Sequence, residues 1–167
     1  MIGFMGSGKS TLGPRLAARL GVHFLDLDVE IERRAACTIA ELVAAEGEAA
    51  LRRQELEALR ALVDAAPPGC VIATGGGIVE SPEARTLLRA LGRIVWLEAE
   101  PEASVSRLPG PARAARPLLD ADGAWRQRWA LRQPHYRALA DAVVNTYPDA
   151  IDASLERLIA LARAERA

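Results

Sequence analysis

Residues 3–11 read Gly-Phe-Met-Gly-Ser-Gly-Lys-Ser-Thr, which fits the spacing Gly-x-x-x-x-Gly-Lys-Ser of a polyphosphate-binding loop. Glycines without a Cβ let the backbone wrap closely around a large anion, and successive N–H groups then point inward at the start of a helix. In such a loop Lys9 reaches the outer phosphates and the Ser10 hydroxyl contacts the accompanying Mg²⁺. The sequence therefore predicts a nucleotide site formed by Gly6, Ser7, Gly8, Lys9, Ser10 and Thr11.

Lys9 is the only lysine in the chain, because all the other basic residues among its 21 lysines and arginines are arginine. A general preference for arginine accounts for the surface, but it does not account for the one lysine in the predicted loop. A compact ammonium group on a flexible stem suits a crowded phosphate site, and a wide guanidinium group does not. The position of this lysine supports nucleotide binding.

Two further groups of residues follow expected strands. Asp26 and Asp28 come after the short apolar segment 22–25, where the carboxyl ends of strands in open α/β sheets bind ligands. The alternative is that Asp28 only caps a helix over 29–36. Gly75–Gly77 follow the strand-like segment 70–74, which indicates backbone that passes close to a ligand, although a plain tight turn also fits.

The elements that must position these residues alternate between strand and helix. We expect strands at the chain start and over 22–25, 70–74, 93–97 and 142–145, with helical segments between them. This alternation predicts an α/β domain with a five-stranded parallel sheet flanked by helices. Only two residues precede Gly3, so we expect upstream residues to complete the first strand. Pro14 predicts a kink or an irregular first turn in the helix over 9–20.

Composition narrows the class of protein further. At 167 residues, with 50% hydrophobic residues, the chain is expected to form one domain. A net charge of −1 and a pI near 6.2 give no support to nucleic-acid or membrane-surface binding. No apolar run has membrane-spanning length and no basic leader precedes one, so we expect a cytoplasmic protein. Cys37 and Cys70 match no metal spacing and are expected to be free thiols.

A phosphate-binding loop alone does not separate kinases, GTPases and ATP-driven machines. GTPases that read guanine through Asn-Lys-x-Asp need a second lysine, which this chain lacks. Residues 109–117 are rich in proline and glycine and carry arginines, which is typical of a lid over a phosphotransfer site, with a surface loop as the alternative. A small kinase with a positioned acceptor fits these features best.

Taken together, the motifs resemble those of the shikimate kinase family over essentially the whole chain. The resemblance rests on residues 3–11, Asp26-Leu-Asp28, Glu48-Ala-Ala-Leu-Arg52, Gly75–Gly77, Arg116-Pro-Leu-Leu119 and Arg132-Gln-Pro-His-Tyr136. It implies one nucleoside-monophosphate-kinase-like P-loop NTPase domain over 1–167, with strand order 2-3-1-4-5, a substrate-binding region at about 28–62 and a lid at about 108–117. It also implies ATP-dependent phosphorylation of the 3-hydroxyl of shikimate, with Mg²⁺, on the route to aromatic amino acids.

The resemblance also implies roles for individual residues. Ser10 and Asp26 would hold Mg²⁺, and Asp28 would hold the acceptor hydroxyl and take its proton. Arg52 and Arg132 would grip the shikimate carboxylate, since a guanidinium fork matches a planar carboxylate. The remaining assignments are backbone contacts to the substrate from Gly75, Gly76 and Gly77, phosphate contacts from Lys9 and Arg116, and adenine contacts from Arg107 and Pro148.

The chain departs from the family pattern at Leu51, where an aromatic residue is common, and at Pro14, where a basic residue is usual. The lid spacing also differs from the usual one. Because Leu51 keeps an apolar side chain, we expect weaker affinity at most. Two other functions stay open: a kinase for another polyol acid such as gluconate, and a nucleotide-binding regulatory module without turnover. A monomer that binds only small molecules is expected.

Overall fold

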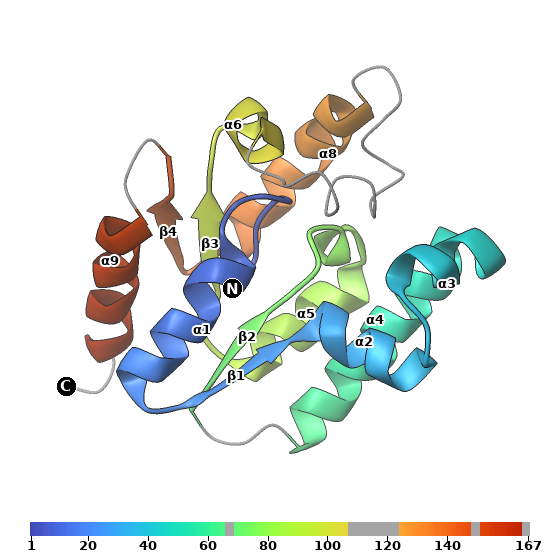
Figure 1. Cartoon of the computed structure of the whole chain (residues 1–167), viewed down its shortest axis with the longest axis horizontal. Helices are drawn as coiled ribbons and strands as arrows, with labels where there is room; N and C mark the ends of the chain where they lie inside the picture. Colours follow the sequence, from blue (N-terminus) through green and yellow to red (C-terminus); the bar gives the residue numbers. More distant parts are fainter. Residues whose placement is uncertain (66–68, 107–123, 148–150, 165–167) are drawn as a thin grey trace.

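Helices and short strands alternate along the chain in the computed structural model, which describes residues 1–65, 69–106, 124–147 and 151–164 (Figure 1). The elements are α1 (Lys9–Leu20), β1 (His23–Asp26), α2 (Leu27–Ala35), α3 (Ile39–Glu46), α4 (Glu48–Ala65), β2 (Cys70–Ala73), the 3₁₀ turn η1 (Ile78–Glu80), α5 (Pro82–Leu91), β3 (Val95–Glu98), α6 (Pro101–Ser106), α8 (Ala124–Leu139), β4 (Ala142–Asn145) and α9 (Ile151–Arg163). Within the described ranges, every helix is too short or too polar to cross a membrane.

Among the described residues, the named strands form two parallel pairs. β1 pairs with β2, and β3 pairs with β4. The start of the chain contributes only an isolated parallel bridge, in which Ile2 N–H donates to the Val95 carbonyl and Leu97 N–H donates to the Ile2 carbonyl, both at 2.9 Å. Gly3 then leaves the extended direction of the chain at φ +150°, so no longer strand forms here. The parallel α/β class is confirmed. The order 2-3-1-4-5, in which the chain start is strand 1 and β1 to β4 are strands 2 to 5, stays a prediction.

Two groups of buried side chains stabilise this arrangement. The smaller one joins α1, β3, β4 and α9, which lie together on one side of the molecule (Figure 1). The larger one contains Phe4, Trp96 and Tyr136, with Trp129 packed against it. Trp96 stacks on Tyr136 at 5.8 Å between ring centroids, and Phe4 meets Trp129 edge-on at 5.4 Å. Aromatic packing therefore fixes the loop that contains Phe4 against α8.

Local capping signals account for several helix boundaries. Thr38 and Glu41, three positions apart, form a capping box at the start of α3, and Ser81 caps α5 with Pro82 at its first position. The alternative role of Asp28 as a helix cap is wrong, because Asp26 caps α2 by accepting the Asp28 N–H at 3.1 Å. The predicted irregular first turn does not appear, since α1 runs as a continuous helix with Pro14 inside it, and the alternative, a kink at Pro14, stays a prediction.

Candidate active site

The predicted phosphate-binding loop curls around the Lys9 side chain before α1 begins. The Lys9 ammonium group donates to the carbonyls of Gly3 and Phe4, at 2.7 and 2.8 Å, and to the Ser7 hydroxyl at 3.2 Å. Gly6 adopts φ +71°, and a Cβ there would lie 2.7 Å from the carbonyl carbon of Ser104 in α6. Both the left-handed backbone and the close approach therefore require glycine at this point.

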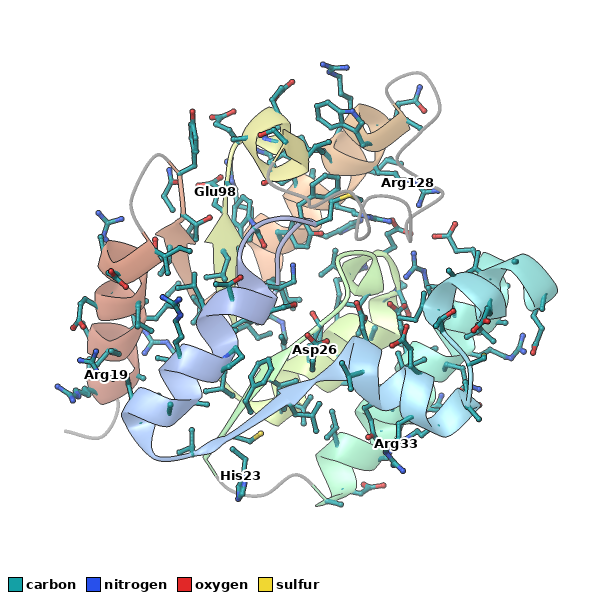
Figure 2. The ribbon with its side chains drawn as sticks, in the orientation of Figure 1. Arg19, His23, Asp26, Arg33, Glu98 and Arg128 are labelled. Carbon is teal, nitrogen blue, oxygen red and sulfur yellow. The ribbon has the colours of Figure 1, made fainter. Side chains whose placement is uncertain are left out.

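Ser10 and Asp26 lie side by side at the mouth of this loop. The Ser10 hydroxyl donates to Asp26 Oδ2 at 3.2 Å, and Asp26 Oδ1 accepts the Asp28 N–H. Figure 2 shows Asp26 where β1 meets α2. Among the described residues, histidine, cysteine, aspartate and glutamate form no group of three that could hold a metal ion. One hydroxyl and one carboxylate fit Mg²⁺, which keeps several waters and shares phosphate oxygens with a nucleotide.

The three glycines after β2 form a turn that is packed tightly against charged side chains. A Cβ on Gly75 would lie 2.8 Å from Asp28 Oδ1, and one on Gly77 would lie 2.6 Å from Arg52 Nη1. Gly76 lies against the Gly3 carbonyl of the phosphate-binding loop. None of the three glycines has a positive φ. Close approach of side chains, and not an unusual backbone conformation, therefore favours glycine here, because a Cβ would push the Asp28 carboxylate and the Arg52 guanidinium group out of their positions.

Arginines and glutamates from α4, η1 and α8 form one network beside this turn. We call it the arginine–glutamate cluster; it consists of Arg52, Arg128, Arg132, Glu48, Glu55 and Glu80. Arg52 donates to Glu55 at 2.7 Å and to Glu48 at 2.6 Å. Arg132 Nε donates to Glu80 Oε1 at 2.6 Å, and Arg128 donates to Glu48 at 3.3 Å. Arg52 and Arg132 are therefore joined through Glu80, which lies 3.5 Å from Arg52 Nη2.

Burial sets the protonation of several groups in this region. Glu55 is only 3% exposed, and this burial raises the pKa of its carboxyl although the charge of Arg52 opposes the shift. Burial acts against the charged form of Glu48 too, but the hydrogen bond from Arg128 and the charge of Arg52 lower its pKa. Burial also raises the pKa of the Tyr136 phenol, which stays protonated and donates to the Gly76 carbonyl at 2.5 Å.

The structure brings Asp28, Arg52, Gly75–Gly77 and Arg132 into one region, next to the phosphate-binding loop. Sequence reasoning did not single out Glu48, Glu55, Glu80, Arg128 or Tyr136 as members of it. The spacings of Glu48, Arg52 and Glu55 along α4 place them on one helix face, and this signal could have identified the two glutamates. Glu80 contacts residues far away in the sequence, so no local pattern indicates it.

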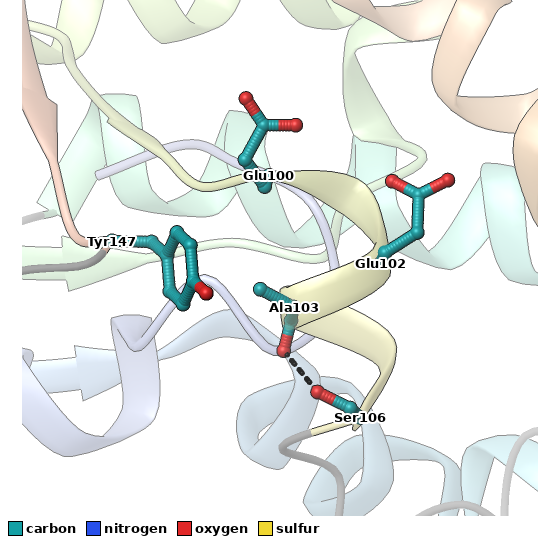
Figure 3. A pocket seen from close by; sticks show the side chains of 5 residues that line it. All are labelled: Glu100, Glu102, Ala103, Ser106 and Tyr147. Carbon is teal, nitrogen blue, oxygen red and sulfur yellow. Dashed lines mark hydrogen bonds between the residues drawn. The ribbon is translucent and has the colours of Figure 1, made fainter.

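Several predicted nucleotide contacts cannot be placed. Arg107, Arg116, Pro148 and the predicted lid at 108–117 lie outside the described residues. Tyr147, which precedes Pro148, lines an open hollow of about 490 Å³ with Glu100, Glu102, Ala103 and Ser106 (Figure 3). The hollow borders α6, the helix against which Gly6 packs, and the residues that line it include no member of the arginine–glutamate cluster.

The parallel α/β fold and the loop around Lys9 define a P-loop domain that binds a nucleotide. The family model for shikimate kinase matches residues 5–163. The chain therefore belongs to the shikimate kinase family, and it is a kinase that uses ATP with Mg²⁺. The predicted family is confirmed.

Individual relatives agree with this assignment. A shikimate kinase from Symbiobacterium thermophilum is 43% identical over 149 residues, which cover 87% of this chain and 84% of the relative. One from Francisella tularensis subsp. novicida is 39% identical over 149 residues, covering 87% and 83%. A structure of the Acinetobacter baumannii shikimate kinase in complex with shikimate gives a TM-score of 0.89 at 32% identity, covering 98% of this chain and 91% of that one. The Aquifex aeolicus shikimate kinase gives 0.83 at 28% identity, covering 99% and 95%.

Proposed function

We propose that this chain transfers the γ-phosphoryl group of Mg-ATP to the 3-hydroxyl of shikimate, at an acceptor site between the glycine turn, α4 and α8. One observation carries the proposal: Arg52 and Arg132, from distant parts of the chain, both contact the carboxylate of Glu80, one on each oxygen. Two guanidinium groups at this spacing suit a carboxylate on the acceptor. The shikimate-bound relative from Acinetobacter baumannii supports this substrate.

Asp28 is proposed to orient the acceptor hydroxyl and to take its proton. Its carboxylate lies beside Gly75, and its own N–H is bound by Asp26, the partner of Ser10. Asp28 is therefore placed between the arginine–glutamate cluster and the loop that holds the nucleotide phosphates. A carboxylate at this position aligns the hydroxyl oxygen with the phosphorus atom and accepts its proton as the bond forms.

Positive charge from the loop and the lid stabilises the phosphoryl group in transfer. Lys9 is proposed to act on the outer phosphates, and Ser10 and Asp26 to hold Mg²⁺, which supplies further positive charge to those oxygens. Arg116 is proposed to join them when the segment 108–117 closes, while Arg107 and Pro148 contact the adenine. Water exclusion by that closure limits hydrolysis of ATP.

The architecture in this proposal is a single monomeric domain over 1–167, located in the cytoplasm, with strand order 2-3-1-4-5. The isolated bridge of Ile2 to Trp96 supports that order on one side of the first strand. The hydrogen bond from the Met1 nitrogen to the Ile72 carbonyl, at 2.6 Å, supports it on the other.

Replacement of Arg52 by lysine is expected to raise the KM for shikimate by about 10- to 150-fold, because a charge-assisted hydrogen bond is worth about 1.5–3 kcal/mol. Lysine keeps a cation beside the buried Glu55 but loses the planar fork, so the fold and the KM for ATP should be preserved. Arg53→Lys is the matched control, since Arg53 is 62% exposed and pairs with Glu46 on the surface. An equal rise in the KM for ATP would contradict a role confined to shikimate.

The function itself is tested by release of ADP from Mg-ATP with shikimate, with gluconate and without an acceptor. Release with shikimate alone is the expected result. Release with gluconate alone would retain the kinase and overturn the proposed acceptor site. No release with either acceptor, together with measurable ATP binding, would indicate a regulatory module.

A further inference from the structure

Glu80 contacts both arginines that the proposed function assigns to the shikimate carboxylate. Its Oε1 accepts from Arg132 Nε at 2.6 Å, and its Oε2 lies 3.5 Å from Arg52 Nη2. One carboxylate therefore spans the two guanidinium groups with one oxygen to each. This is the geometry in which two arginines would hold the carboxylate of an acceptor.

The backbone of Glu80 is fixed, but its carboxylate borders solvent. The side chains of Ile78 and Val79 are fully buried, and the Glu80 N–H donates to the Gly77 carbonyl at 3.0 Å. The Glu80 side chain is 36% exposed, whereas that of Arg132 is 5% exposed. The Glu80 carboxylate can therefore rotate into the solvent at a small cost in free energy, whereas the Arg132 guanidinium group stays in place.

The charges of the cluster oppose the presence of a further carboxylate. Its three arginines face three glutamates, and the carboxylates of Asp28 and Glu55 both lie beside Gly75, within the same region. An acceptor carboxylate between Arg52 and Arg132 would share their donors with Glu80, at a distance where like charges repel in a partly buried site. Binding of such an acceptor therefore has to displace the Glu80 carboxylate.

We propose that Glu80 is a specificity-determining residue, whose carboxylate competes with the carboxylate of the acceptor for Arg52 and Arg132. An acceptor with a carboxylate that reaches both arginines displaces Glu80, and a neutral acceptor leaves Glu80 on them. Glu80 thereby lowers the affinity for acceptors with a carboxylate, such as shikimate, but not the affinity for uncharged polyols, and so it sets how strongly the site prefers the first class over the second. The inference deepens the proposed function and rests on it.

Glu80→Gln tests the competition, because glutamine keeps the size and an oxygen that accepts from Arg132 but removes the negative charge. The expected result is a three- to tenfold decrease in the KM for shikimate, with the KM for ATP and kcat changed less than twofold. Direct titration with shikimate, followed by tryptophan fluorescence, should show the same decrease in Kd. The methyl ester of shikimate, which has no carboxylate, should show a change in Kd of less than twofold.

Glu83→Gln is the matched control, since it removes the same charge three residues further along, where Glu83 pairs with Arg60 and its side chain is 52% exposed. An equal decrease in this variant would indicate a general charge effect and overturn the proposal. An unchanged or raised KM in Glu80→Gln would also overturn it, and a raised KM would assign Glu80 to the positioning of Arg132.

If Glu80→Gln does not fold, the same titration is made with Glu80→Ala, for which the Kd for shikimate is again expected to decrease. Absence of turnover by the unmodified protein with shikimate would instead contradict the proposed function. In that case the titrations with shikimate and its ester still report whether Glu80 competes with a carboxylate.

Discussion

Asp28→Asn is expected to lower kcat for shikimate phosphorylation by about 10²- to 10⁴-fold, the range typical of the loss of a general base. Asparagine has nearly the same size, and the hydrogen bond to Asp26 comes from the backbone N–H of residue 28, so the start of α2 should be unaffected. An amide can still contact the acceptor hydroxyl, but it cannot take its proton. Steady-state kinetics with saturating ATP and shikimate measure the effect.

The matched control for this variant is Asp152→Asn, because the Asp152 side chain is 90% exposed and pairs only loosely with Arg15 at 3.6 Å. It should retain the kcat of the unmodified protein. A kcat within tenfold of that value in Asp28→Asn would remove the proposed role in proton transfer. Loss of ATP binding together with turnover would point to misfolding, which thermal unfolding would reveal.

The parts of the fold that the sequence predicts well are those specified by neighbouring residues. The capping box of Thr38 and Glu41 requires only residues three positions apart, and α3 begins where it predicts. Gly21 and Gly47 follow α1 and α3 at left-handed or otherwise positive φ, as their positions after helical patterns indicate. Helix boundaries depend on residues within a few positions of one another, so the local sequence is sufficient to predict them.

The strands are less well specified, because pairing depends on residues far apart in the chain. β1, β2 and β3 each have four residues, and the first predicted strand is reduced to the single bridge at Ile2. Alternation of strand and helix is sufficient to predict parallel pairing, since each connection includes a helix. It does not determine how many residues of each strand join a ladder.

The candidate site likewise combines features that the local sequence predicts with features that depend on residues far apart in the chain. The phosphate-binding loop is contiguous in the sequence, and so is the glycine turn, so motif spacing identifies both. The contact of Glu80 with Arg132 crosses 52 positions, and that of Tyr136 with Gly76 crosses 60. Such contacts form only after the turn is packed against α8. Their consequence, a charged network around the proposed acceptor site, can be read only from the structure.

The phosphate-binding loop and the proposed acceptor site are mechanically connected. Gly76 lies against the Gly3 carbonyl, and Tyr136 bonds to the Gly76 carbonyl from the helix that carries Arg132. Phe4 packs against Trp129 of the same helix. A change in the position of the loop would therefore be transmitted to the residues around the acceptor, which bears on substitutions at Lys9.

Lys9→Arg is expected to lower kcat by about 10²- to 10³-fold, although it keeps the positive charge, because a positioned donor to the transferring group is lost. The ammonium nitrogen approaches the carbonyls of Gly3 and Phe4 within 2.8 Å, and a planar guanidinium group does not place one nitrogen there without moving the loop. The loop has little room, since even a Cβ on Gly3 would lie 2.6 Å from the Leu97 carbonyl. Kinetics with varied ATP measure the effect.

Arg19→Lys provides the control, because it adds a lysine to the same helix at a side chain that is 52% exposed and pairs with Glu156. Full activity there, with the predicted loss in Lys9→Arg, would show that the position and shape of the cation matter. Near-normal turnover in Lys9→Arg would contradict this, because charge alone would then suffice at the outer phosphates. In that case the single lysine of this arginine-rich chain would need an explanation other than the geometry of phosphate transfer.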